Sequence, residues 1–485
     1  MVVQSTIQRL SGIVATVILA RTLGPTSLGN YSVTNTTASS FYGFFRLGAD
    51  FGVHVLTASM DPAKATKQIN ELLGAALTLF LLIGCVGCGA CLLFAHTIAS
   101  GLFNTPTLVD FVRVAAFLFL GQAIAQYTYV AFAGLHAFRA YVRVTLLMAP
   151  ITTVLLVLGA IVGGAIGAAW GAVLGQAVTV IVLGMSLSRV SAALGLKLRP
   201  RLHGHLLKQI LTVGLPFYLA GLLQIPSDYF AQGLMVRMHG VSMLGDLRVI
   251  VTITAIISFL PNALNGPMIS IFSRAHADDR TLDSQRLVFT NLRVVWIVVL
   301  VASMVLGALW RFVIGLGFGH SYGAAQHVGY IALITATAYC LRNVVSNWLL
   351  ASRRQLSIFA LNSLDAITFI AVAIAFIPRY GLVGYLIAQA SGACIPMFVI
   401  WAAACLKSGD RKVSIATLAA FFLTLTVFAI IAWVNIATVT WYTATAVVVA
   451  GGIAVSIMWL LFILEREERK ILYDLISSPS GFREN

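Results

Sequence analysis

Apolar runs of roughly 17 to 25 residues, the length that a helix needs to cross membrane hydrocarbon, recur along the whole chain. Only 10% of the 485 residues are charged and the mean hydropathy is +0.94, whereas soluble domains carry about a quarter charged residues. Strands of a closed barrel would alternate in short segments of about ten residues. The sequence therefore predicts an all-α polytopic membrane protein.

The runs divide into about fourteen predicted transmembrane helices. Their expected bounds are 2–22, 27–55, 71–98, 111–134, 141–162, 166–188, 207–237, 243–270, 291–314, 326–351, 356–377, 382–406, 414–434 and 441–464. With the N-terminus inside, 22 of the 31 Lys and Arg residues fall in inward segments and five in outward segments. Since cytoplasmic loops carry an excess of basic residues, both termini are expected in the cytoplasm. This bias also explains the net charge of +15 without a nucleic-acid partner.

A thirteen-residue segment is present twice. Residues 21–33 (RTLGPTSLGNYSV) return 216 positions later as residues 237–249 (RMHGVSMLGDLRV), with Gly24 and Gly29 matching Gly240 and Gly245. Both copies read as helical hinges, because glycine frees the backbone and Ser, Thr, Asn or Asp caps the following helix. Six predicted helices separate the copies, and an even number restores the orientation. The sequence thus predicts two pseudo-symmetric six-helix bundles related by an axis along the membrane normal.

Glycine spacing and a basic loop complete the predicted organisation. Gly163, Gly167, Gly171 and Gly175 form a ridge of small residues at i+4 spacing, partly repeated from Gly384, so both helices are expected to pack very closely on a neighbour. With Pro216 and Pro226, the seventh helix is expected to be discontinuous. The predicted domains are an N-terminal bundle (1–188), a basic cytoplasmic linker (189–208), a C-terminal bundle (209–406), two peripheral helices (407–464) and a cytoplasmic tail (465–485).

Ionisable residues inside predicted transmembrane helices are costly unless they serve a pathway or form ion pairs, so they are the candidate site residues. The candidate substrate-binding residues are Arg9, Arg46, Asp50, Asp228, Arg237, Arg248 and Arg342. Arg46 and Asp50 are one helical turn apart and are expected to pair. Arg9 has no acid within helical reach. Asp228 either converges with Arg237 and Arg248 on the outer part of a central cleft or forms a hinge ion pair with them.

The sequence lacks the motifs of the common enzyme, nucleotide-binding and metal sites. We find no nucleophile with a base, no paired carboxylates and no phosphate-binding loop, so an enzyme is not expected and transport would run on a gradient or on the membrane potential. Cys85, Cys88 and Cys91 share one predicted helix face, but no His or acid accompanies them, which favours packing over a metal site. No cofactor is expected.

Four short segments resemble those of polysaccharide flippases, which belong to the multidrug, oligosaccharidyl-lipid and polysaccharide exporter superfamily. The segments are ARTLGPTSLGNYSV (20–33), FRLGADFGV (45–53), GLP (214–216) and GFGHSY (317–322). The resemblance implies twin six-helix bundles in a bacterial inner membrane. It also implies outward flipping of an undecaprenyl-diphosphate-linked oligosaccharide, with arginines in a central cavity meeting the diphosphate.

The resemblance leaves alternatives open. A cation-coupled multidrug exporter of the same superfamily typically needs a carboxylate in its first bundle, and the first 49 residues here contain no acid. The lipid-linked peptidoglycan precursor is an alternative substrate of a flippase. A third interpretation is a membrane scaffold for a synthase complex, which would transport nothing. The implied partners are the lipid-linked oligosaccharide, membrane lipids, and polysaccharide polymerase and glycosyltransferase machinery.

Overall fold

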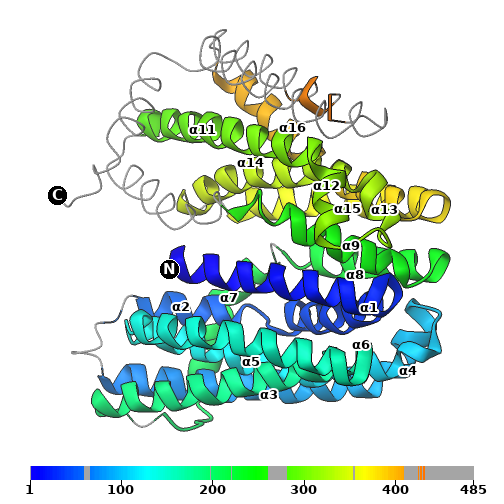
Figure 1. Ribbon diagram of the computed structural model, residues 1–485. Coiled ribbons are helices and arrows are strands. Elements are labelled where there is room, and N and C mark those ends of the chain that lie inside the picture. Colours follow the sequence, from blue (N-terminus) through cyan, green and yellow to red (C-terminus); the bar gives the residue numbers. More distant parts are fainter. Residues whose placement is uncertain are drawn as a thin grey trace. The chain divides into compact units, whose positions relative to one another are not determined.

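The computed structural model describes residues 2–58, 60, 66–196, 198–219, 221–259, 281–352, 355–408, 424, 426–428, 430 and 431. This described part is helical and contains no strand (Figure 1). Its helices are α1 (Val2–Phe45), α2 (Ala49–Ala58), α3 (Thr66–Leu93), α4 (Ala95–Thr97), α5 (Val109–Gly134), α6 (Phe138–Ala193), α7 (Gly204–Leu219), α8 (Gln224–His239), α9 (Ser242–Thr254), α11 (Thr281–Ala308), α12 (Trp310–Gly317), α13 (Gly323–Val328), α14 (Ala332–Ala351), α15 (Gln355–Tyr380) and α16 (Leu382–Ser408), with short turns of 3-10 or π-helix at Ile98–Leu102, Pro106–Leu108 and Gly329–Ile331.

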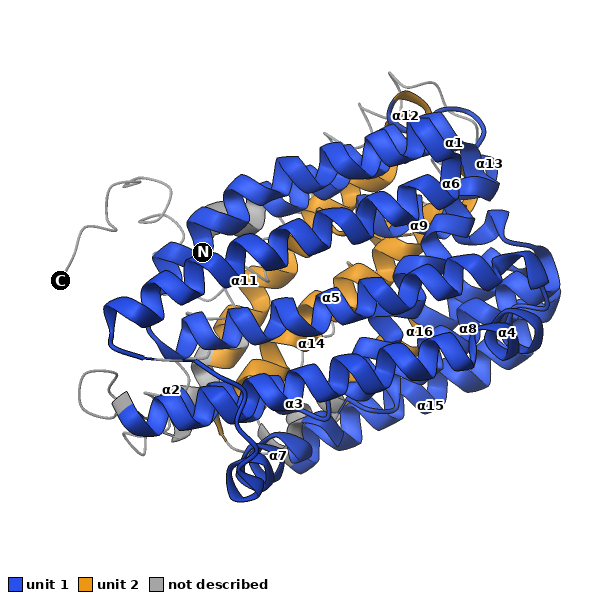
Figure 2. Cartoon of the chain, turned by 90° about the horizontal axis from the view of Figure 1, so that it is seen from below, with its two compact units in different colours: residues 1–253, 317–325, 355–389 blue, residues 254–316, 326–354, 390–485 orange. Residues whose placement is uncertain are grey.

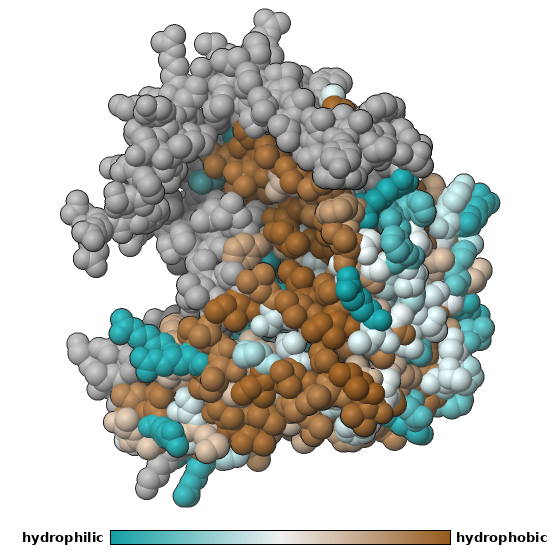
Figure 3. Space-filling model, in the orientation of Figure 1, coloured by the Kyte–Doolittle hydropathy of each residue, from teal (hydrophilic) through white to brown (hydrophobic). Residues whose placement is uncertain are grey.

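Eight helices of the described part are long and apolar enough to cross a membrane. Residues 138–162 of α6 show how such a helix meets lipid: Leu147, Val154 and Ile161 follow at seven-residue spacing and are 61%, 55% and 65% exposed. Figure 3 shows hydrophobic residues across the middle of the helices and hydrophilic residues gathered toward their ends. The chain is therefore a multi-pass membrane protein, as predicted. The fourteenth predicted helix, the tail, most of the thirteenth predicted helix and residues 260–270 of the eighth lie outside the described residues.

Contacts divide the chain into two compact units (Figure 2). Unit 1 comprises Met1–Ile253, Gly317–Ala325 and Gln355–Gln389, and unit 2 comprises Thr254–Leu316, Gln326–Arg354 and Ala390–Asn485. In unit 1, α1, α5 and α6 pack on one another, α3 packs on α5, α2 on α7, and α15 on α8, while in unit 2 α11 packs on α14. The predicted bundles divide the chain elsewhere, at residues 189–208, and stay a prediction.

Two of the helices consist of two arms. In α1, Gly24 (φ 72°, ψ 176°) separates a first arm (2–23) from a second arm (25–45). In α6, Gly163 and Gly164 separate a first arm (138–162) from a second arm (165–193), and Gly164 has φ 59°. Glycine adopts such positive φ angles without the steric cost that a Cβ imposes. The predicted boundaries between the first and second helices, and between the fifth and sixth, lie at these kinks.

The repeated hinge has the same backbone conformation in both copies. Gly24 has φ 72° and ψ 176°, and its counterpart Gly240, between α8 and α9, has φ 89° and ψ 166°. The two predicted hinge glycines thus share one backbone conformation, in the positive-φ region that glycine adopts without steric cost.

The structure corrects one predicted helix and confirms another expectation. The helix predicted over 27–55 ends at Phe45, and α2 begins at Ala49, because Leu47 and Gly48 adopt positive φ angles of 49° and 73° that interrupt it. The seventh helix is discontinuous as predicted, since α7 ends at Leu219 and α8 begins at Gln224. Pro226 lies in the first turn of α8, where the missing N–H removes no helical bond.

Gly167, Gly171 and Gly175 of the predicted ridge pack closely, whereas Gly163 lies at the kink of α6 and a Cβ there would meet nothing within 4 Å. A Cβ on Gly167 would lie 2.1 Å from the carbonyl oxygen of Gly159, and one on Gly171 would lie 2.5 Å from that of Leu155. The neighbour is therefore the first arm of α6 itself. A Cβ on Gly384 would likewise lie 2.4 Å from the carbonyl oxygen of Phe376, so the partial repeat of the ridge also makes a backbone contact.

Candidate functional site

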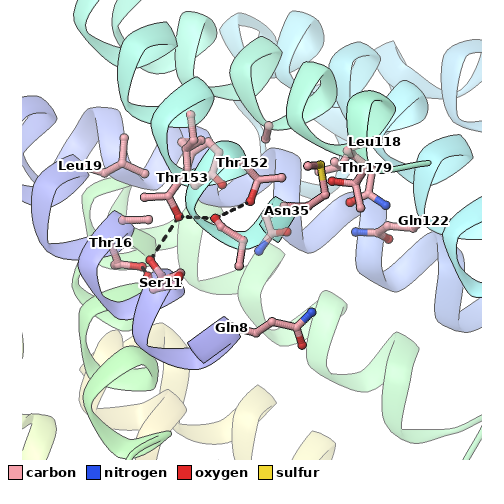
Figure 4. A pocket seen from close by; sticks show the side chains of 18 of the residues that line it. Gln8, Ser11, Thr16, Leu19, Asn35, Leu118, Gln122, Thr152, Thr153 and Thr179 are labelled. Carbon is pink, nitrogen blue, oxygen red and sulfur yellow. Dashed lines mark hydrogen bonds between the residues drawn. The ribbon is translucent and has the colours of Figure 1, made fainter. Parts of the chain in front are cut away.

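A pocket of about 380 Å³ lies within unit 1 and is lined from both arms of α1, from α5, from both arms of α6 and from α9 (Figure 4). Its volume falls within the usual range for small-ligand sites, roughly 300–1,000 Å³. The polar side chains of the lining are Gln8, Ser11, Thr16, Tyr31, Asn35, Gln122, Thr145, Thr152, Thr153, Gln176, Thr179 and Arg248. Polar residues inside membrane-spanning helices are costly and commonly mark substrate pathways, so the pocket is the candidate functional site.

Helical register explains why these residues meet. On the first arm of α6, Thr145, Thr152 and Leu156 occupy one face at spacings of seven and four residues, and line the pocket. Leu147 and Val154 occupy the exposed face of the same arm. One arm thus turns polar residues to the pocket and aliphatic residues outward.

The pocket threonines donate their hydroxyl protons to their own helices. Thr16 Oγ1 donates to the carbonyl oxygen of Gly12 at 2.8 Å, Thr152 Oγ1 to that of Ala149 at 2.9 Å, and Thr179 Oγ1 to that of Gly175 at 2.8 Å. This back-bonding satisfies each hydroxyl proton inside the membrane. The hydroxyl oxygens keep their lone pairs, so they act toward the pocket as hydrogen-bond acceptors.

The pocket amides differ in how they are held. Gln176 Nε2 donates to the carbonyl oxygen of Gly121 at 3.3 Å, which fixes that side chain across α5 and α6. The amides of Gln8, Asn35 and Gln122 form no hydrogen bond to the residues that the structure describes. Figure 4 shows Asn35 and Gln122 among the sticks that line the pocket. Each amide offers both a donor and an acceptor to a bound molecule.

Arg248 supplies the positive charge of the pocket. It lies on α9 and, of the seven candidates from the sequence, it is the residue that lines the pocket. Its Nε is buried and has no hydrogen-bond partner within the described residues. A buried donor without an acceptor is unfavourable. The guanidinium is therefore poised to bind an anion that enters the pocket.

Arg46 and Asp50 form the predicted ion pair. Arg46 Nη1 lies 3.3 Å from Asp50 Oδ2, and the two side chains are 35% and 16% exposed. The pair spans the break between α1 and α2. Arg46 Nε is buried and has no hydrogen-bond partner in the part of the chain that the structure describes, so Asp50 satisfies only part of the guanidinium.

The remaining candidates lie elsewhere. Arg9 is half-buried on the first arm of α1, next to the pocket residue Gln8. Arg237 is exposed in the last turn of α8. Arg342 belongs to unit 2, is buried on α14 and lies 4.5 Å above the ring of Tyr339. The seven candidates therefore do not form one cluster.

Asp228 is bound differently from the predicted hinge ion pair. Its Oδ1 accepts a hydrogen bond from Tyr385 Oη at 2.5 Å and its Oδ2 accepts one from Gln232 Nε2 at 2.9 Å. The expectation that it pairs with Arg237 or Arg248 is wrong, because neutral donors on α8 and α16 satisfy the carboxylate instead.

The segment 317–325, which contains GFGHSY and the start of α13, forms hydrogen bonds to both hinge copies. Tyr322 Oη donates to the carbonyl oxygen of Ala20 at 2.9 Å, and Arg21 Nε donates to that of Gly317 at 2.8 Å. The N–H of Ala325 donates to Asp246 Oδ1 at 3.0 Å. Burial, reinforced by the nearby Asp246, raises the pKa of Tyr322 above its usual 10.0, so its hydroxyl remains a donor. This segment thus connects the ends of the first and second hinge.

Solved structures with the same fold are membrane transporters. The lipid II flippase MurJ in an inward closed conformation gives a TM-score of 0.68 at 14% identity, over 98% of this chain and 99% of that one. An inward-facing multidrug resistance MATE family transporter gives 0.65 at 14% identity, over 83% and 96%. A MOP superfamily transporter from Pyrococcus furiosus gives 0.59 at 14% identity, over 84% and 94%. The chain therefore has the fold of the MOP superfamily of transporters.

The sequence comparison is more specific. The family described as polysaccharide biosynthesis protein matches residues 2–327, about two thirds of the chain, and the chain belongs to this family. The predicted relationship to polysaccharide flippases of this superfamily is thereby confirmed at the level of family and fold. No curated protein sequence matches the chain.

Sequence reasoning identified Arg248 but missed the uncharged polar lining. The candidates from the sequence were ionisable residues in predicted helices, which leaves out uncharged amides and hydroxyls. The spacing of Thr145, Thr152 and Thr153 on one face of an apolar helix, together with Gln122, was a usable signal. A membrane helix face that carries hydroxyls and amides is expected to contact another helix or a polar cavity and not lipid.

Proposed function

We propose that this protein flips an undecaprenyl-diphosphate-linked oligosaccharide from the cytoplasmic to the outer leaflet of the bacterial inner membrane by alternating access. The observation that carries the proposal is the buried, unpartnered Nε of Arg248 in the polar pocket of unit 1. Membership in the polysaccharide biosynthesis family supports a glycan-bearing substrate. The flippase MurJ, a structural neighbour, is named for a lipid-linked substrate.

The charge of the substrate explains the need for a buried arginine. A diphosphate carries about two negative charges, each of which costs several kcal/mol in hydrocarbon unless water or a cation accompanies it. Guanidinium groups bind phosphate oxygens through two parallel N–H donors and stay charged when buried. Arg248 lowers the barrier for the headgroup, and Arg9 and Arg46 are proposed to assist along the path.

The membrane potential then supplies direction. An inside-negative potential of roughly 100 mV drives an anion with two charges outward by about 4–5 kcal/mol, at about 2.3 kcal/mol per charge. Flipping therefore needs no nucleotide. Glycosyltransferases on the cytoplasmic side would supply the substrate, and a polymerase on the outer side would consume it.

Two alternatives to this function are another lipid-linked substrate and a different kind of transporter. The lipid-linked peptidoglycan precursor shares the diphosphate and is favoured by the 98% coverage of the MurJ fold. A cation-coupled multidrug exporter is less favoured, because the described residues that line the pocket include Arg248 but no Asp or Glu to hold a cation.

Reconstituted flipping tests the proposal. Wild-type protein in proteoliposomes should move a fluorescent undecaprenyl-diphosphate-linked oligosaccharide between leaflets, and an inside-negative potential should accelerate it. Arg248→Gln should lower the initial rate about tenfold or more, whereas Arg113→Gln, which removes an exposed arginine paired with Asp110, should not. No movement of this lipid by the folded wild-type protein, or an unchanged rate in Arg248→Gln, would contradict the proposal.

A further inference from the structure

The pocket of Arg248 contains more hydrogen-bonding capacity than a diphosphate uses. A diphosphate presents acceptors only, so it pairs with donors such as a guanidinium. The hydroxyls of Thr152 and Thr179 have given their protons to their own helices and face the pocket as acceptors. Acceptors repel phosphate oxygens. This part of the lining therefore suits a different chemical group.

Sugar hydroxyls fit the remaining lining. A hydroxyl both donates and accepts, so it can donate to the Thr152 and Thr179 oxygens and bond either side of an amide. The amides of Asn35 and Gln122 are half-buried and have no hydrogen bond to the described residues. Met148 and Leu156 give the same lining apolar surface for the C–H groups of a sugar ring.

The charge of the lining points to an uncharged sugar. Among the described residues no Asp or Glu lines the pocket, so an amino sugar with a free ammonium group would lack a counter-ion from them. Arg248 is the cation among these lining residues, and in the proposed function it binds the diphosphate. With a volume of about 380 Å³ the pocket holds the headgroup region and not a whole oligosaccharide.

We propose that Asn35, Gln122, Thr152 and Thr179 form a subsite for the uncharged sugar that is attached directly to the diphosphate. The subsite rests on the proposed function, because Arg248 anchors the diphosphate within the same pocket. Through this subsite the protein recognises the first sugar of the glycan. Glycans with an uncharged first sugar bind better than the bare lipid diphosphate, and substitutions in the outer sugars do not alter this preference.

Binding of two tritiated lipids to the immobilised protein in detergent micelles tests the subsite. The probes are undecaprenyl diphosphate and undecaprenyl diphosphate carrying one N-acetylhexosamine. In the wild type the sugar should raise the affinity about tenfold, the effect of one or two additional hydrogen bonds to buried groups. Gln122→Leu and Thr152→Val should each reduce this ratio of affinities toward one.

A matched control lies one helical turn further along α5. Gln126 is the same residue type on the same helix and is outside the pocket lining, so Gln126→Leu should keep the wild-type ratio. The subsite is wrong if Gln122→Leu and Thr152→Val keep the wild-type ratio, if Gln126→Leu loses it equally, or if the sugar adds no affinity in the wild type. If neither lipid binds the folded protein, the proposed function fails and the subsite fails with it; if the bare lipid binds in an Arg248-dependent way without a sugar effect, only the subsite fails.

Discussion

Gly29 on the second arm of α1 meets the backbone of Val241, the residue before α9, so closely that a Cβ on Gly29 would lie 2.1 Å from the Val241 carbonyl oxygen. The contact joins the first hinge copy to the second. Because the clash is with a carbonyl oxygen, no side-chain rotation can relieve it.

The same contact is made a second time with the roles exchanged. A Cβ on Gly245 would lie 2.1 Å from the carbonyl oxygen of Pro25. Gly245 is the counterpart of Gly29 in the repeat, and Pro25 is the counterpart of Val241, each offset by 216 residues. The two hinges thus cross about a local pseudo-two-fold axis, as the duplication predicts.

We expect Gly29→Ala and Gly245→Ala to destabilise the protein and to impair flipping together. Forcing a methyl group into a packed interior costs about 1–3 kcal/mol, and a backbone neighbour places these two sites at the upper end. Thermal unfolding in detergent and the proteoliposome flipping rate are the measurements. The two variants should be similar to each other because the contacts are equivalent.

Gly184→Ala is the matched control for the hinge glycines. Gly184 is also helical, on the second arm of α6, but a Cβ there would meet nothing within 4 Å. Alanine in an open helical site is neutral or stabilises by roughly 0.5–1 kcal/mol. If Gly184→Ala lowers stability as much as Gly29→Ala, or if both hinge variants behave as wild type, the crossed hinges are spacers without a packing role.

The hinge shows which parts of the fold the sequence could predict. Glycine identity and spacing are visible in a sequence, so both copies and the helix directions that follow were predictable. The break at Leu47 and Gly48 was not, because it depends on a tertiary contact: a Cβ on Gly48 would lie 2.2 Å from the carbonyl oxygen of Gly214 on α7. A hydropathy pattern shows how long an apolar segment is, but it does not show tertiary contacts of this kind.

Tyr322→Phe should weaken the attachment of the GFGHSY segment to the first hinge. It removes the 2.9 Å hydrogen bond to the Ala20 carbonyl oxygen and leaves that oxygen without this donor, at a cost of about 1 kcal/mol. The unfolding temperature of the purified variant should fall accordingly. Tyr322→Ala would also leave a cavity, so Phe is the cleaner change.

The stabilisation by Tyr322 should depend on pH with a defined sign. Burial raises its pKa in the folded protein above the ordinary 10.0. Below pH 10 both states keep the proton and the full contribution is present; as the pH rises above 10 the unfolded chain ionises first, which favours unfolding. The stability difference between wild type and Tyr322→Phe should therefore shrink only above pH 10. A difference that shrinks between pH 6 and 9 would contradict the assigned donor role.

Cysteine accessibility tests the predicted topology. His203 in the basic linker and His320 in the GFGHSY segment are both exposed. On a background without native cysteines, His320→Cys should react with an impermeant maleimide added outside intact cells, while His203→Cys should react only after permeabilisation. Labelling of His203→Cys from outside would overturn the cytoplasmic assignment of the linker.

The pocket shows what the sequence could not predict about the site. Arg248 was predictable because charge inside an apolar helix is conspicuous. The other lining residues were not predictable as a set. Gln8, Asn35, Gln122 and Thr152 come from four separate helical segments, and only the tertiary packing brings them into one lining. Conversely, Arg342 looked equivalent to Arg248 in sequence but lies in unit 2, above the ring of Tyr339.

The Arg46–Asp50 pair should set how tightly the anionic headgroup is held on its path. Asp50 engages Nη1 at 3.3 Å, while Nε has no partner within the described residues, so the guanidinium is half satisfied. Arg46→Ala should slow flipping more than Arg46→Lys, because Lys keeps the charge but loses the paired donors. In Asp50→Asn the competing carboxylate is gone, so undecaprenyl diphosphate should bind several-fold more tightly yet flip more slowly, since a state that holds its ligand too well is populated at the expense of the next one. Binding in detergent and initial rates in proteoliposomes measure the two effects separately. Should Asp50→Asn leave both unchanged while the protein folds normally, the pair serves only to hold the junction of α1 and α2.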